Sequence, residues 1–471
     1  MDSKSEKTLN AALTRKQAEA IYDSGREAVV FAMLQLAQRV AELERQLPES
    51  SPTTPSGMKP AYEKPTVQSR SKKPGCHKGH AGHRRLPPER IDRHVEHRLE
   101  RCPDCGSPVK RCHRVRKRYV EDIPEDLKAE VTEHAIHRDW CPRCKKSVEP
   151  VVSDALPNST LGNRVLVLTA WLHYALGNTL SQIIEVFNFH LPIRLTAGGL
   201  SDQWRRLAEI LEDWYETIRQ EALRSAVLHA DETSWRVTGK THWLWCFATA
   251  NLTYFMIDKC RGSPALMKFF TQEFSGTLVT DFWGAYNKVC CARRQLCLVH
   301  LLRDFLTVEQ YKRPGPHWAE FAKKAKRLIH DAIRLGKRND VAAEEFASRR
   351  VRLDMRLQEL IDASWEDSQA KRLIKRLRRH QNQLFTFLDQ PDVPFDNNHG
   401  ERSIRPAVIM RKNSYCNRSD RGARTQAVLM SVYRTLKQRN HDPVATVVQA
   451  LSEYLKTGKL PPLPSKNTAY G

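Results

Sequence analysis

Three acidic residues, Asp231, Asp281 and Glu401, stand where they could share metal ions. Apolar runs that begin at residues 226 and 276 lead directly into Asp231 and Asp281, whereas Glu401 follows an amide-rich segment in a basic stretch. Carboxylate oxygens suit Mg²⁺ or Mn²⁺, and a pair of such ions can activate one oxygen and stabilise another during displacement at phosphorus. The residue types therefore predict a two-metal phosphoryl-transfer site. Taken singly, each acid is equally a turn former, a helix cap or a surface ion pair.

The elements that must position these acids follow a recognisable order. Strands are predicted at residues 226–237, 243–249, 252–257, 276–281 and 295–300, and the last of these leads into a helix. Three strands, an acid-tipped strand and then helices are the order of a ribonuclease-H-like fold, in which acids at strand ends meet at one edge of the sheet. A charged, basic helical stretch before Glu401 predicts an inserted helical subdomain, so the fold class is α/β multidomain.

The segment around Glu401 carries candidate bracing and phosphate-binding residues. Asn397 and Asn398 are expected to cap the helix that carries Glu401. Cys297 and His300 are expected to brace the core, with a metal-ligand pair as the alternative. The predicted phosphate-binding side chains are Arg402, Arg405, Arg411 and Lys412.

Two Cys-x-x-Cys pairs predict one structural zinc ion, held by Cys102, Cys105, Cys141 and Cys144. Alternation at residues 115–119 and 131–137, with a turn at 124–126, predicts a zinc-ribbon-like module. Cys112 and His113 are possible substitute ligands, and redox chemistry is the alternative use of the pairs.

Basic residues indicate a polyanionic partner. The chain of 471 residues has 77 Lys and Arg against 54 Asp and Glu, a formal charge of +23. A Gly- and His-rich arm predicts contact with DNA phosphates through Lys78, Arg84 and Arg85. A solvated linker is the alternative, as is metal binding by Cys76, His77, His80 and His83.

Helices predicted around residues 180–187 and 201–207 suit a helix-turn-helix unit, in which Arg205 and Arg206 would contact DNA. Ordinary helix packing explains the same pattern.

An N-terminal helix is predicted from Ser24 to Leu47, opened by a capping box of Ser24 and Glu27. Its apolar positions have coiled-coil spacing and predict a homodimer or higher assembly, with docking on the same chain as the alternative; they are Val29, Met33, Leu36, Val40, Leu43 and Leu47. The first residues lack the apolar core of a signal peptide, and the apolar run at 165–176 is too short to span a bilayer. We expect a cytoplasmic protein without membrane contact.

Four motifs, at residues 229–233, 280–287, 297–303 and 396–414, resemble the TnpC-type transposases of the insertion sequence 66 family. The resemblance implies a ribonuclease-H-like DDE transposase whose triad falls on Asp231, Asp281 and Glu401. It also implies cleavage at the ends of a bacterial insertion sequence, transfer of the 3′ hydroxyl to target DNA, and small accessory proteins as partners. Asp281-Phe282-Trp283 departs from the aspartate-glycine-tyrosine of that family, and Cys297-Leu298-Val299-His300 from its cysteine-tryptophan-alanine-histidine.

The expected organisation has eight segments. They are an N-terminal helix at 1–48, a basic arm at 49–90, the zinc module at 91–155, the helix-turn-helix-like region at 156–222, the first part of the core at 223–315, the helical insertion at 316–390, the second part of the core at 391–440 and a C-terminal tail at 441–471. Two other functions fit the same features: a domesticated DNA-binding regulator, and a ribonuclease-H-like nuclease that cuts without joining.

Overall fold

The computed structural model describes residues 15–46, 88–110, 117–121, 123, 127–312, 314–315, 317–338, 340–414 and 416–467. The chain divides into two units, Met1–Ala61 and Tyr62–Gly471. Residues 49–87 of the basic arm, with Lys78, Arg84 and Arg85, lie outside the described residues. So do Cys112, His113 and the turn at 124–126.

The first unit contains two helices, α1 (Arg15–Asp23) and α2 (Arg26–Gln46). The predicted capping box is wrong, because the Ser24 hydroxyl donates to Ala20 O at 2.7 Å and Gly25 has a φ of +94°. A left-handed glycine ends a helix, so Ser24 belongs to the end of α1. On α2, Met33 and Leu36 are 67% and 63% exposed, which leaves the predicted apolar stripe open over the side chains described in this unit.

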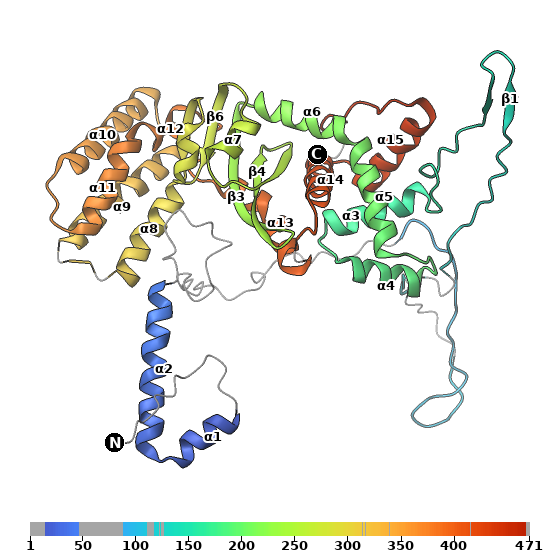
Figure 1. Ribbon diagram of the computed structural model, residues 1–471, viewed down its shortest axis with the longest axis horizontal. Helices are drawn as coiled ribbons and strands as arrows, with labels where there is room; N and C mark the ends of the chain where they lie inside the picture. Colours follow the sequence, from blue (N-terminus) through green and yellow to red (C-terminus); the bar gives the residue numbers. More distant parts are fainter. Residues whose placement is uncertain are drawn as a thin grey trace, which may run out of the picture. The chain divides into compact units, whose positions relative to one another are not determined.

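A five-stranded sheet of order β5-β4-β3-β6-β7 forms the centre of the second unit (Figure 1). The strands are β3 (Val227–Val237), β4 (Lys240–Ala248), β5 (Thr253–Asp258), β6 (Phe274–Thr280) and β7 (Cys291–Leu296). The first three form an antiparallel meander, while β6 lies parallel to β3 and β7 parallel to β6. The predicted α/β class is confirmed, and the five strands follow one another in the expected order. The bounds predicted for the fifth strand are wrong, because β7 ends at Leu296 and residues 298–300 already belong to the helix that follows.

Asp231 lies inside β3 instead of at its end, because the pairing with β4 continues to Val237. The parallel pairing of β3 with β6, however, covers only residues 227–229, and β6 itself ends at Thr280. Asp231 and Asp281 therefore both lie just beyond the β3–β6 pairing, at one edge of the sheet. Gly276 permits this close pairing, since a Cβ there would lie 2.3 Å from Ser225 O.

Helices that precede the sheet in the sequence and helices that follow it pack with the sheet in one hydrophobic core. Helix α13 (Asn398–Ser414) packs on β3 and β4, and α14 (Asp420–Gln438) packs on β5 beside α6 (Glu212–Leu223). Helices α3 (Asn163–Tyr174), α4 (Leu180–His190) and α5 (Ala197–Ile210) complete this core, and the short α7 (Ser263–Phe269) follows β5. The expected C-terminal tail contains α15 (Pro443–Thr457), which packs on α3 and buries Val447 and Leu451.

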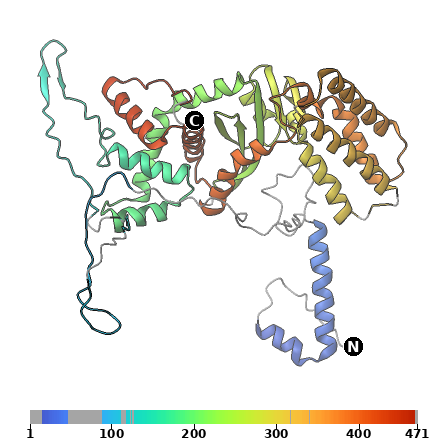
Figure 2. The same cartoon turned by 180° about the vertical axis from the view of Figure 1, so that it is seen from behind.

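A second hydrophobic core consists of helices that follow β7. These are α8 (Leu298–Tyr311), α9 (Trp318–Gly336), α10 (Ala343–Asp362), α11 (Ser368–His380) and α12 (Thr386–Asp389). They lie beside β6 and β7, at the opposite end of the sheet from α3, α4 and α5 (Figures 1 and 2). The two cores meet where β6 ends, which is also where Asp281 lies.

The region with the cysteine pairs has a hairpin of β1 (Asp139–Cys141) and β2 (Lys146–Val148) around the second pair. The strands predicted at 115–119 and 131–137 are wrong wherever the structure describes them, since residues 117–121 and 127–137 have no strand pairing. Val131 is 90% exposed, which shows that the apolar side chains of this segment have no core to pack against.

None of the described helices has the length and apolar character needed to cross a lipid bilayer.

Candidate active site

The sheet edge and α13 bring the three predicted carboxylates into electrostatic contact. Asp281 is 8% exposed, and burial together with the charges of Glu232 and Glu401 raises its pKa to about 8. Burial and the charges of neighbouring acids, Asp281 and Glu401 among them, likewise raise the pKa of Asp231 well above its usual value. Like charges have such effects only at short range, so the fold gathers Asp231, Asp281 and Glu401 in one place.

Backbone amides orient the two aspartates. Glu232 N–H donates to Asp231 Oδ1 at 2.9 Å, and Trp283 N–H donates to Asp281 Oδ1 at 2.8 Å. Each bond holds one carboxylate oxygen in place.

Asn397 joins the start of α13 to β3. Its side chain is 1% exposed, donates to Ala230 O at 2.9 Å and accepts from His229 Nδ1 at 2.9 Å. The expected side-chain cap is therefore wrong for Asn397, whose amide instead clamps the strand next to Asp231. Gly400 leaves room for that amide, since a Cβ there would lie 2.8 Å from Asn397 Oδ1.

Asn398 is not a capping acceptor either. Its side chain donates to Asp396 Oδ2 at 2.7 Å, and its backbone N–H donates to Asp396 Oδ1 at 3.0 Å. Asp396 thus accepts the N-terminal N–H that sequence reasoning had assigned to the asparagines.

Cys297 connects three backbone segments. Its N–H donates to Thr280 O at 2.9 Å, and its Sγ accepts from Asn397 N–H at 3.2 Å. Burial raises the pKa of this thiol to about 12, so it is neutral at physiological pH. These contacts tie the end of β6 to the starts of α8 and α13.

His300 and Arg303, one turn apart on α8, face the third carboxylate. Arg303 Nη1 lies 3.4 Å from Glu401 Oε1, and His300 Nε2 lies 3.6 Å from the same oxygen. His300 was expected to brace the core, with metal binding as the alternative, and in the structure it contacts Glu401 of the candidate site directly. Arg303 was missed, although it lies within the motif at residues 297–303.

In the part of the chain that the structure describes, no group of three or more His, Cys, Asp or Glu side chains is arranged to hold a metal ion. Glu401 contacts Arg303 and His300 instead. For Cys297 and His300, the alternative of a metal-ligand pair thus gains no support.

The four zinc candidates remain as two separate pairs. Gly106 N–H donates to Cys102 O at 2.8 Å in the first turn, and Cys144 N–H donates to Cys141 Sγ at 3.5 Å in the second. Hydrogen bonds from Ser107 lower the pKa of Cys105, and those from Cys144 lower the pKa of Cys141. The described residues do not bring the four cysteines together in a group that could hold a metal ion, so the predicted zinc site is not supported.

The predicted DNA-binding cations differ in how exposed they are and in whether they bind other residues of the protein. Arg402, Arg405 and Lys412 are exposed on α13. Arg411 is half-buried and donates to Thr233 Oγ1 at 2.9 Å and Ser234 O at 2.7 Å, so its guanidinium holds α13 against β3.

On α5, Arg205 pairs with Asp202 and Glu209, and Arg206 donates to Pro157 O at 2.7 Å. Both guanidinium groups therefore have partners within the helical region itself.

Sequence reasoning also missed a fourth acid, Glu232, which is 1% exposed and pairs with Arg261 at 3.0 Å. The signal was available, because an acid next to Asp231 in a strand must point to the opposite face and there needs a buried partner.

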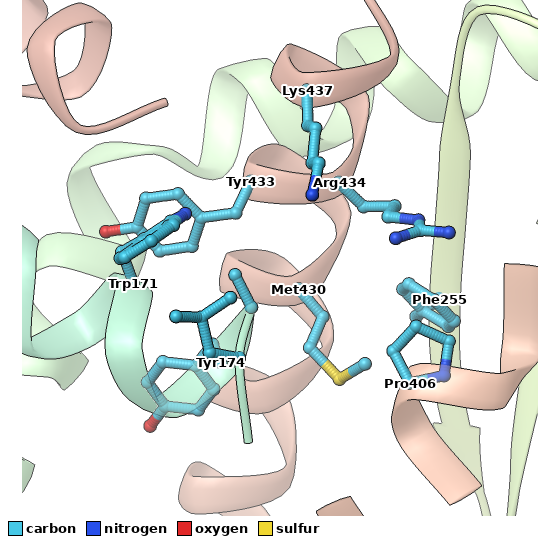
Figure 3. Close-up of a pocket in the computed structure, with 10 residues that line it drawn as sticks. Trp171, Tyr174, Phe255, Pro406, Met430, Tyr433, Arg434 and Lys437 are labelled. Atoms are coloured by element: carbon cyan, nitrogen blue, oxygen red, sulfur yellow. The ribbon is translucent and has the colours of Figure 1, made fainter. Parts of the chain in front are cut away.

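A small pocket lies between α3, β5, α13 and α14, apart from the carboxylates (Figure 3). Arg434 and Lys437 extend toward it from α14, and its other labelled walls are Trp171, Tyr174, Phe255, Pro406, Met430 and Tyr433.

Comparison with known proteins gives a family match over the region that holds this site. A sequence model described as "Transposase IS66 family" matches residues 158–425, more than half of the chain. The matched span includes Asp231, Asp281 and Glu401.

Three curated relatives come from Sinorhizobium fredii (strain NBRC 101917 / NGR234), and each is named only as an uncharacterized protein. The protein y4qI is 26% identical over 260 residues, which cover 47% of this chain and 47% of the relative. The protein y4jD is 24% identical over 317 residues (57% and 60%), and y4hP is 21% identical over 378 residues (71% and 66%). The chain thus spans about half the length of the first of these relatives.

Proposed function

The chain belongs to the IS66 family of transposases, and from this premise we propose that it is a metal-dependent DDE transposase. It cleaves DNA strands at the ends of a bacterial insertion sequence and transfers the freed 3′ hydroxyl to target DNA. The observation that carries the proposal is the convergence of Asp231 on β3, Asp281 just after β6 and Glu401 on α13, which lie close enough for their charges to interact.

The core that holds these residues is proposed to be ribonuclease-H-like. In support, an antiparallel meander continues into two parallel strands, and the acids lie where the pairing of β3 with β6 ends. Helix α13 then supplies the third acid from a distant part of the sequence.

The chemistry of the donor set fits Mg²⁺ or Mn²⁺. Carboxylate oxygens are hard ligands, and a divalent cation would offset both the burial and the repulsion between acids that raise the pKa values of the two aspartates. When bound, a pair of such ions supplies Lewis-acid activation of the attacking and leaving oxygens. Asp231, Asp281 and Glu401 would hold the ions, and Glu401 would leave its contacts with Arg303 and His300 to do so.

The cations beside the site have a separate role in the proposal. Arg402 and Arg405 extend from the same helix as Glu401 and are exposed, so they can contact the phosphates that flank the reacting bond. Arg303, 41% exposed, can turn from Glu401 toward a DNA phosphate.

The partners follow from this activity. We propose double-stranded DNA, both element ends and target, as the substrate, and small accessory transposition proteins as possible partners in the cytoplasm. A homodimer or higher assembly would form through the exposed apolar side chains of α2. For the two cysteine pairs we keep the proposal of one structural zinc ion.

The test uses the full chain with labelled DNA that carries the element's own ends, in Mg²⁺ or Mn²⁺. Wild-type protein should give both nicked and joined products, whereas Asp231→Asn, Asp281→Asn and Glu401→Gln should each abolish both and still bind the ends. Asp340→Asn, an exposed acid in the helical insertion, is the matched control and should keep full activity.

Retained cleavage in Asp231→Asn would refute the triad. Nicked products without joined ones would identify the protein as a nuclease, and end binding without cleavage as a DNA-binding regulator.

A further inference from the structure

An ion pair between buried Glu232 and partly buried Arg261 lies beside the carboxylate site. Glu232, 1% exposed, accepts from Tyr286 Oη at 2.6 Å and from Arg261 Nη2 at 3.0 Å and Nε at 3.2 Å. Burying a carboxylate costs free energy unless hydrogen bonds and a counter-charge accompany it, and here both are present. Arg261 is therefore held at a defined place by Glu232.

Two indole rings enclose the same guanidinium. Arg261 Cζ lies 4.5 Å from the ring centroid of Trp243 and 4.0 Å from that of Trp283. The indole N–H of Trp283 also donates to Arg261 O at 3.3 Å. Stacking and the hydrogen bond together fix Trp283 against Arg261.

Trp283 in turn contacts a carboxylate of the site. Its backbone N–H donates to Asp281 Oδ1 at 2.8 Å. A chain of direct contacts thus runs from Glu232 through Arg261 and Trp283 to Asp281.

Phe282 anchors the same loop from the other side. Arg376 of α11 lies 5.2 Å from its ring centroid, and the ring of His380 meets it edge-on at 5.9 Å. The two residues after Asp281 therefore pack against different cores: Phe282 packs against the helical insertion, and Trp283 packs against the first core beside Arg261. A glycine and a tyrosine in these places, the pair expected from the family resemblance, would lack the first of these anchors.

We propose that Trp283, held in place by Arg261 and Glu232, is a positioning residue that orients the Asp281 carboxylate for divalent metal binding. This inference rests on the proposed function, because it takes Asp281 as a metal ligand. The side chain of Trp283 acts through the loop, so its loss leaves every candidate ligand present but Asp281 less ordered.

The test measures the Kd of Mn²⁺ for the full chain without DNA, by isothermal titration calorimetry. Trp283→Ala should raise the Kd about 10-fold, the scale expected when a residue that supports a ligand is removed. Trp283→Phe keeps a ring over Arg261 and should return the Kd to within about 3-fold of wild type, since most of the stacking survives. Trp171→Ala, which removes another partly buried tryptophan, from α3, is the matched control and should leave the Kd unchanged.

The outcomes separate the inference from its premise. A wild-type Kd in Trp283→Ala, with binding lost in Asp281→Asn, would overturn the positioning role alone. Undiminished binding in Asp281→Asn would refute the metal site itself and, with it, the inference. If Trp283→Ala does not fold, Arg261→Lys takes its place, because lysine keeps the charge beside Glu232 but loses the planar stack. A Kd raised in that variant supports the role, and an unchanged Kd overturns it.

Discussion

Replacing Asn397 with alanine should destabilise the core far more than replacing its neighbour Asn398. The Asn397 amide is buried and joins α13 to β3 through bonds to Ala230 O and His229 Nδ1, each 2.9 Å long. Burial lowers the pKa of His229 to about 4, so its ring is neutral at pH 7 and donates through Nδ1. The Asn398 side chain makes one partly buried bond, to Asp396 of the same loop.

The magnitude follows from what each change leaves behind. Asn397→Ala leaves the carbonyl of Ala230 and the Nδ1–H of His229 buried without partners, at about 1–3 kcal/mol each, so the total should be about 2–6 kcal/mol. Asn398→Ala removes a local bond whose net contribution is about 1 kcal/mol, because water can replace it.

Hydrogen exchange measured by mass spectrometry is the appropriate assay, because the second unit has two hydrophobic cores and its global unfolding need not be two-state. Peptides from β3 and α13 should lose protection in Asn397→Ala, whereas those from α9 and α10 should not. Equal protection of β3 in the Asn397→Ala and Asn398→Ala proteins would refute the clamp and the reasoning that derives its energy from two buried bonds.

Three further predictions concern other parts of the molecule. Without divalent metal, Asp281 has a pKa of about 8 in the folded protein and near 3.8 in the unfolded chain, so the stability of the wild type should fall relative to that of Asp281→Asn as the pH rises from about 4 to 8. Urea unfolding of both proteins across this pH range measures the difference in stability, and a difference that stays constant would contradict the prediction. Gly276→Ala should cost about 1–3 kcal/mol, because its Cβ would meet Ser225 O at 2.3 Å, while Gly198→Ala in α5, with open space around its Cβ, should be neutral or slightly stabilising; thermal unfolding compares the two, and similar values would dismiss the steric argument. Cys102→Ser combined with Cys105→Ser should release one zinc ion per chain in elemental analysis if the cysteine pairs share a metal, and unchanged zinc content would rule that site out.

Much of the architecture follows from local patterns. Alternation and β-branched or aromatic residues place the five strands in order, and an apolar run that ends in an acid identifies Asp281 as a sheet-edge residue. Such features depend on neighbours within a few positions, and for this reason one sequence suffices to find them. Where the local pattern lacked a hydrophobic partner, as in the strands expected at 115–119 and 131–137, it failed.

The roles of individual side chains were decided by tertiary packing. The sequence marks Asp231, Asp281 and Glu401 as candidates, but only the docking of α13 on β3 brings the last of them to the other two. The same docking makes Asn397 a clamp instead of a cap and half-buries Arg411 against β3. These contacts join residues far apart in the chain, and their partners are chosen by the shape and burial of the assembled sheet, which no local periodicity records.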